Sequence, residues 1–122
     1  MILVDTSIWT DHFRRSEAEL VAYLGQGQVL AHPFVIGELA LGHLHHRDAV
    51  LDALSGLPQA VVASDSEVLG FIARAELTGL GIGYIDAHLL AAVRLTPPAR
   101  LATRDKRLHK AAERLGLSIA LG

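Results

Sequence analysis

The sequence contains no cysteine, one tryptophan and one methionine, and its aromatic residues make up only 5% of the chain. Disulfide bonds and thiolate zinc sites are therefore excluded, which suits a protein of the reducing cytoplasm. No apolar run is long enough to cross a bilayer without a charged residue or a histidine, so we expect no membrane association. The opening Met-Ile-Leu-Val-Asp segment is too short and too acidic for a signal peptide, and we expect a cytoplasmic protein.

The composition is that of a globular protein, with 51% apolar and 20% charged residues in a chain of 122. This length suits one hydrophobic core, and we find no repeat, low-complexity tract or linker, so we expect residues 1–122 to form a single domain. The net charge of −2 does not indicate a partner, but six of the eleven basic residues lie in the last quarter of the chain. They are Arg100, Arg104, Lys106, Arg107, Lys110 and Arg114.

Short β-type runs alternate with helical patterns along the chain. Strands are predicted at 2–5, 29–30, 60–62, 101–103 and 117–119. Helices are predicted at 7–13, 16–24, 33–42, 47–54, 84–95 and 106–115, and another from Ser64 or Ser66 to 77. Ser16 and Glu19 have capping-box spacing. The alternation implies an α/β fold with a mainly parallel sheet covered on both faces, and in such sheets sites gather at the carboxyl ends of strands.

Four acidic residues stand in segments that are otherwise apolar. Asp5 ends the first strand, Glu38 lies within a helix, Asp86 lies in the first turn of another helix, and Asp105 joins a strand to a helix. Carboxylates gathered in a fold repel one another unless a cation lies between them, and an all-oxygen acidic cluster favours Mg²⁺ or Mn²⁺. We therefore predict that these four acids converge on a metal site and carry its chemistry.

Three of the acids also have an ordinary structural interpretation. Asp5 and Asp105 precede helices and are suitable N-caps, although Ser7 could cap the first helix in place of Asp5. The helix macrodipole favours an acid at position 86. Glu38 shares a helix side with apolar residues, and glutamate is rarely buried without a partner, so we favour a functional role unless its carboxylate reaches water.

Residues near Asp105 are candidates for supporting roles. Thr103 lies two residues before Asp105 and on the same side of a strand, so its hydroxyl could orient a carboxylate or a metal-bound water. The basic run is usually a solvated helix face. Beside an acidic metal site it also suits the phosphate backbone of a nucleic acid, and the candidate contacts are Arg104, Lys106, Arg107 and Lys110.

Two other clusters are better explained by structural roles than by chemistry. His43, His45 and His46 are dense enough to bind a transition metal, but they follow a helix stop at Gly42 and are better explained as a solvated loop. Trp9 and Phe13 are four residues apart, which is typical of a small apolar packing patch or interface rather than a platform for stacking bases.

The segments that carry the four acids resemble those of PIN-domain ribonucleases. They are Met-Ile-Leu-Val-Asp-Thr-Ser at 1–7, the helix around Glu38, Tyr-Ile-Asp-Ala-His-Leu-Leu-Ala-Ala at 84–92 and Leu-Ala-Thr-Arg-Asp-Lys-Arg-Leu at 101–108. The whole chain is similar to the VapC toxins of bacterial type II toxin–antitoxin pairs. The resemblance implies a three-layer α/β/α sandwich, Mg²⁺- or Mn²⁺-dependent endonucleolytic cleavage of RNA, a VapB-type antitoxin and a homodimer. It places Asp5, Glu38, Asp86 and Asp105 at the family's acidic positions, with Thr103 as an accessory.

Two other function classes share part of the pattern. A receiver-like signalling domain has this size and an acidic Mg²⁺ site, but it needs a phospho-accepting aspartate after the third strand, where Asp65 instead begins a helix. A PIN fold that binds without catalysis is the second, and the intact acidic set argues against it. For the toxin, we expect an antitoxin segment to occupy a groove lined by some of four apolar residues, namely Trp9, Phe13, Phe34 and Val35.

Overall fold

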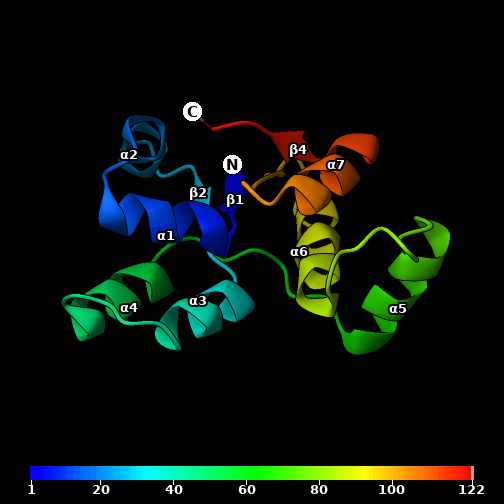
Figure 1. Ribbon diagram of the computed structural model, residues 1–122, viewed down its shortest axis with the longest axis horizontal. Coiled ribbons are helices and arrows are strands. Elements are labelled where there is room, and N and C mark those ends of the chain that lie inside the picture. Colours follow the sequence, from blue (N-terminus) through cyan, green and yellow to red (C-terminus); the bar gives the residue numbers. More distant parts are fainter. Residues whose placement is uncertain (122) are drawn as a thin grey trace.

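The computed structural model describes residues 1–121, which form seven helices and four strands (Figure 1). In chain order these are β1 (Ile2–Val4), α1 (Thr6–Arg14), α2 (Ala18–Gly25), β2 (Val29–Leu30), α3 (Pro33–Ala40), α4 (Arg47–Ser55), α5 (Asp65–Arg74), α6 (Tyr84–Arg94), β3 (Arg100–Ala102), α7 (Lys106–Arg114) and β4 (Ser118–Ile119). The strands pair in parallel in the order β2-β1-β3-β4. The predicted α/β fold with a parallel sheet is confirmed.

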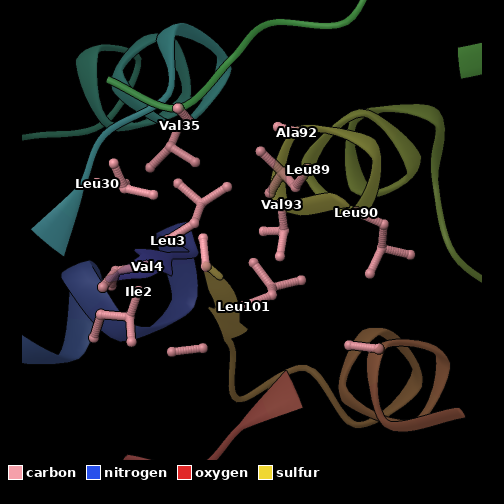
Figure 2. Close-up of a cluster of buried hydrophobic side chains, with 14 of the residues drawn as sticks. Ile2, Leu3, Val4, Leu30, Val35, Leu89, Leu90, Ala92, Val93 and Leu101 are labelled. Atoms are coloured by element: carbon pink, nitrogen blue, oxygen red, sulfur yellow. The ribbon is translucent and has the colours of Figure 1, made fainter. Parts of the chain in front are cut away.

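Strand β1 lies at the centre of the core. Its residues Ile2, Leu3 and Val4 are all at most 2% exposed, and because successive strand residues point to opposite faces, both faces of the sheet are covered. Figure 2 shows the Leu3 side chain between Val35 of α3 and Leu89 of α6. Truncating a leucine this deeply buried typically costs about 2–5 kcal/mol of folding free energy.

Helix α6 is buried on every side along most of its length, since all residues from Ala87 to Val93 are buried. A helix that is apolar all round belongs in a core. Its first turn emerges at the sheet edge, and there the helix carries Asp86, which is half-buried. The helix therefore acts as a rigid support for one carboxylate.

None of the helices in residues 1–121 is long and apolar enough to cross a bilayer.

The strand predicted at 60–62 is wrong. Only one parallel bridge, Ala31 to Gln59, extends the sheet at this edge. The side chains of Val61 and Val62 are about half exposed, at 47% and 49%. The Val61 N–H donates to the Thr96 side chain at 3.0 Å rather than to a strand. The β-branched run was therefore misleading, because only its first residue bonds to the sheet edge, through the Ala60 N–H to the Ala31 carbonyl at 2.9 Å.

Of the two caps predicted from serine residues, Ser16 and Ser64, one is present. Helix α2 begins at Ala18 after Glu17, and no side chain caps it, so the predicted Ser16–Glu19 capping box is wrong. Helix α5 begins as predicted after Ser64, whose Oγ accepts from the Glu67 N–H at 3.2 Å while the Glu67 carboxylate accepts from the Ser64 N–H at 2.9 Å. This reciprocal pair satisfies two N–H groups that the first turn leaves free.

Candidate metal centre

Asp5 stands at the carboxyl end of β1 and is 7% exposed. It occupies the N-cap position of α1, but its side chain makes no capping bond. Instead its Oδ2 accepts hydrogen bonds from the Thr103 hydroxyl at 2.7 Å and the Ser7 hydroxyl at 3.0 Å. Ser7 is not the cap either, because the backbone N–H of Arg104 donates to its Oγ at 3.1 Å. Asp5 is therefore held in place by two hydroxyl groups.

The pKa of Asp86 is affected by two of the other predicted acids. Burial raises the pKa of its carboxyl group, the Gly83 N–H lowers it by donating to Oδ2, and the negative charges of Asp5 and Asp105 raise it further. Such repulsion acts only over short distances in a protein. The structure thus brings Asp5, Asp86 and Asp105 together at one edge of the sheet although they are as much as 100 residues apart.

Asp105 combines two roles. Its Oδ1 accepts from the backbone N–H groups of Arg107 and Leu108, both at 3.0 Å, so it caps α7 as its position after a strand suggested. Its own N–H donates to Thr103 Oγ1 at 3.1 Å. Thr103 therefore links the backbone of one predicted acid to the carboxylate of another, Asp5, which is the orienting contact predicted for it.

Glu38 differs from its sequence-based description. It lies on the exposed side of α3, not in a buried segment, because the apolar residues of the helix that face the core are Val35 and Leu39. Its Oε1 accepts a hydrogen bond from the hydroxyl of Thr6 at 3.0 Å. Thr6 directly follows Asp5, so this hydrogen bond ties Glu38 to the segment that carries Asp5, while the exposed Glu38 carboxylate reaches water.

The four carboxylates share one arrangement. Each uses a single oxygen for the protein's own hydrogen bonds: Oδ2 of Asp5, Oδ2 of Asp86, Oδ1 of Asp105 and Oε1 of Glu38. Within residues 1–121 the second oxygen of each has no hydrogen-bond partner. In the same residues, no three acidic or histidine side chains approach closely enough to hold an ion directly. The donor set fits a hard, strongly hydrated cation that keeps bound water between itself and part of its ligands.

The predicted nucleic-acid contacts fall into two groups. Arg104 is already neutralised, since its guanidinium pairs with Asp11 at 2.6 Å and with Glu17 at 3.0 Å. These two acids raise its pKa. Lys106, Arg107 and Lys110 are exposed and form no ion pair in the described part of the chain. The structure thus separates Arg104 from the other three candidates.

Of the four residues from which the antitoxin groove was expected to draw some of its lining, one lines a cavity. Trp9 and Val35 are buried, at 3% and 2% exposure. The Phe34 ring packs edge-on against His32 and His88, with centroids 5.0 and 4.7 Å apart. Of the four, Phe13 lines a cavity of about 690 Å³ between α1, α3 and the start of α4. The pattern of apolar residues had indicated a surface, but Trp9 and Val35 are buried in the interior and Phe34 is partly buried.

Sequence reasoning missed a buried histidine pair. His32 and His88 are 0% and 2% exposed. Within residues 1–121, His32 Nε2 and His88 Nδ1 have no hydrogen-bond partner, and His88 Nε2 lies 3.3 Å from Asp65 Oδ1 without the geometry of a hydrogen bond. Burial, with the nearby His88, lowers the pKa of His32 to about 4, so it is neutral. His32 caps α3, where its Nδ1 accepts from the Phe34 N–H at 3.0 Å. The signal was available, because a polar residue before Pro33 at the first helical position is typical of a helix start.

The comparisons with known proteins are decisive for the family. Residues 2–114 match the model of the PIN domain. This chain belongs to the PIN-domain family. Two of its relatives within that family are the proteins named Ribonuclease VapC32 from two strains of Mycobacterium tuberculosis. Each is 49% identical over 120 residues, which is 98% of this chain and 97% of the relative. The VapC-type PIN assignment made from the motifs is confirmed.

A solved PIN-like structure supports the fold. The crystal structure of FitAcB from Neisseria gonorrhoeae superposes with a TM-score of 0.64, covering all of this chain and 97% of the other. The sequences are 19% identical, so this likeness concerns the fold alone.

Proposed function

We propose that this PIN-domain protein is a metal-dependent endoribonuclease and the toxin of a type II toxin–antitoxin pair. Relatives named ribonucleases that align with nearly the whole chain support the activity. The observation that carries the proposal is the convergence of three acids: Thr103 links the Asp5 carboxylate to the Asp105 backbone, and the pKa of Asp86 is raised by burial and further by the charges of Asp5 and Asp105. A fold keeps such a cluster when a cation relieves the repulsion. The cation would be Mg²⁺ or Mn²⁺, held by these three residues and Glu38.

The residues of the site divide the work. Asp5 and Asp86, which are the most buried of the four acids, would bind the ion most directly through their free oxygens. Glu38 and Asp105, which are exposed, would bind through water or orient the attacking water. When bound, the ion supplies an activated water and stabilises the charge on the leaving oxygen. The Ser7 and Thr103 hydroxyls keep Asp5 in one orientation throughout.

The partner, location and assembly state are proposed by analogy with the family. We propose a VapB-type antitoxin as the inhibitor, a cytoplasmic location and a homodimer. An arginine or lysine of the antitoxin could enter the acidic pocket, because opposite charge is favoured in a confined site. Exposed apolar side chains on and before α5, including Val61, Val62 and Leu69, are available to a second copy.

The experiment that tests the nuclease is incubation of the purified chain with single-stranded RNA. Fragments should form with Mg²⁺ or Mn²⁺ and not with EDTA, and each variant Asp5→Asn, Glu38→Gln, Asp86→Asn and Asp105→Asn should lose activity. Intact RNA under every metal condition would favour a PIN fold that only binds. The toxin role is tested in cells: expression alone should arrest growth, and co-expression with the adjacent small gene should restore it.

The receiver-like alternative finds no support. Asp65 begins α5 and its Oδ1 accepts from the Tyr84 hydroxyl at 3.0 Å, which stabilises a helix start. Its side chain lies 83% exposed on α5 rather than in a pocket with other acids.

A further inference from the structure

A cavity of about 690 Å³ runs from the acidic cluster along α1 toward the loop between α3 and α4. Two of its lining residues, Thr6 and Glu38, belong to the candidate metal centre and are hydrogen-bonded to each other at 3.0 Å. The cavity is therefore continuous with the place where we propose that the phosphodiester is cut. Its volume falls in the range of roughly 300–1,000 Å³ that is typical of small-ligand sites.

One wall of this cavity, called the groove below, is the ring of Phe13, which is supported by a second aromatic ring. Phe13 is 38% exposed and lines the groove, while its ring stacks on Trp9 with centroids 5.8 Å apart and planes 25° from parallel. Trp9 is itself buried at 3% exposure, so it fixes the ring of Phe13 from behind. An aromatic ring supported on one side and open on the other has the form of a stacking platform. Trp9 packs in the interior, in line with the expectation of a packing or interface pair, and Phe13 lies partly exposed in the groove.

The polar lining of the groove matches an anionic strand. Arg14 lines it and forms no ion pair in residues 1–121. His43 and His45, which the sequence suggested were merely solvated, line the opposite side and offer ring N–H groups. Glu38, the one acid in the lining, stands at the end that joins the metal centre. The cation and hydrogen-bond donors thus lie along the groove, and the negative charge lies where a metal would neutralise it.

The geometry points to a nucleotide subsite: the groove holds an unpaired nucleotide of the RNA next to the cleaved bond, with its base on Phe13 and a flanking phosphate beside Arg14. This assignment rests on the proposed ribonuclease function. Single-stranded RNA is recognised in this way, by aromatic stacking of splayed bases together with arginine contacts. Leu39, Leu44 and Val50 also line the groove, so a protein segment is the alternative occupant, but a mostly apolar segment would leave Arg14 and the two histidines without matching charge. We therefore assign the groove to RNA, and the tests below separate the two occupants.

The subsite is tested first by binding. Fluorescence anisotropy with a labelled single-stranded RNA octamer, in EDTA to prevent cleavage, should show about tenfold weaker binding for Phe13→Ala and near wild-type binding for Phe13→Tyr, which keeps the ring. Arg14→Ala should lower the slope of log affinity against log salt by about 0.7. Arg15→Ala is the matched control, because Arg15 is exposed but does not line the groove, and its slope should equal that of the wild type.

A second test locates the base. A set of RNA substrates, each lacking the base at one position around the cleaved bond, should be cleaved more slowly at one position by the wild type. The Phe13→Ala variant should show no such dependence, because the platform that reads the base is missing. This comparison uses the same protein on different substrates, so loss of folding in the variant cannot mimic it, and far-UV circular dichroism confirms that the variant is folded.

The outcomes separate the two proposals. Wild-type RNA affinity in both Phe13→Ala and Arg14→Ala, together with Mg²⁺-dependent cleavage that Asp86→Asn abolishes, would overturn the subsite and leave the nuclease standing. The same result with lost binding of a purified antitoxin would assign the groove to that partner and likewise overturn the subsite. A wild-type chain that neither binds nor cuts RNA would overturn both.

Discussion

The hydroxyl of Thr103 donates to Oδ2 of Asp5 at 2.7 Å, and it joins two residues that are 98 positions apart in the sequence. Both side chains are buried, at 8% and 7% exposure. The same Thr103 oxygen accepts the N–H of Asp105. The orientation of Asp5, a proposed metal ligand, therefore depends on Thr103, which is a positioning residue and not itself a proposed ligand.

Thr103→Val should reduce cleavage about 10–100-fold, the range found when partners of metal ligands are removed. The loss of a hydrogen bond to a charged group should also cost about 1.5–3 kcal/mol of folding free energy. Thr103→Ser keeps the hydroxyl and should recover both. Single-turnover cleavage rates and urea unfolding provide the measurements. A valine variant with wild-type activity would make the contact structural only.

Asp86→Asn should abolish RNA cleavage and leave the metal-free melting temperature unchanged or higher. The reason is that the amide keeps the hydrogen bond from Gly83 but removes the repulsion from Asp5 and Asp105. Thermal melts in EDTA, paired with a cleavage assay, check both parts. If stability falls clearly and cleavage persists, Asp86 serves only to start α6.

The stabilisation by Asp86→Asn should depend on pH in one direction. The pKa of Asp86 is raised above 3.8 in the folded state, so between 3.8 and that raised value the folded protein binds more protons than the unfolded chain. The wild type therefore loses stability as pH rises through this window. In EDTA the advantage of the variant should be greatest at neutral pH and should vanish near pH 3.8. A difference that is constant with pH would contradict the electrostatic origin.

The double change Lys106→Ala, Lys110→Ala should flatten the salt dependence of RNA binding, by about 0.7 in slope for each lost contact. Arg104→Ala is the internal control, because Arg104 is occupied by Asp11 and Glu17 and should change the slope little. Affinities measured between 50 and 200 mM salt, roughly the range over which phosphate contacts are visible, decide the matter. An unchanged slope in the double variant would show that neither lysine contacts phosphate, and both would then be ordinary residues of a solvated helix face.

Two glycine substitutions should have opposite effects. Gly81 has φ of +76°, and an added Cβ would lie 2.8 Å from the Arg107 side chain, so Gly81→Ala should destabilise the fold by about 1–3 kcal/mol. Gly37 is in the middle of α3 with nothing within 4 Å of an added Cβ, so Gly37→Ala should stabilise by about 0.5–1 kcal/mol. Chemical denaturation of both variants provides the comparison, and equal effects would show that the contact with Arg107 is easily rearranged.

The sequence predicted the sheet because its strands are short runs rich in apolar residues, and β1, which is fully apolar, is buried on both faces. It failed at 60–62, where local β-propensity is as high but the chain meets the sheet at one bridge only. Whether a strand pairs is decided by neighbours distant in sequence, which local pattern does not contain. The same limit applies to Glu38: its spacing showed a helix, but only the packing of α3 shows which side faces water.

The four acids could be recognised in the sequence because carboxylates in apolar segments require an explanation. The groove beside them could not be recognised in this way. Phe13 and Arg14 belong to one helix turn, and His43 and His45 belong to a loop about thirty residues later. Nothing in either segment indicates the other. Contacts between α1 and α3 bring them together, and such contacts depend on the folded core.

The central position of β3 has a consequence for the timing of synthesis. Strand β1 pairs with residues 100–102, which directly precede Thr103 and Asp105, so Asp5 lacks both its neighbouring strand and its Thr103 hydrogen bond until these residues have been made. At roughly 5–20 residues per second, translation from residue 1 to residue 105 takes roughly 5–21 s. During that interval a nascent chain has neither Asp105 nor the hydroxyl that orients Asp5, so we expect it not to cut RNA.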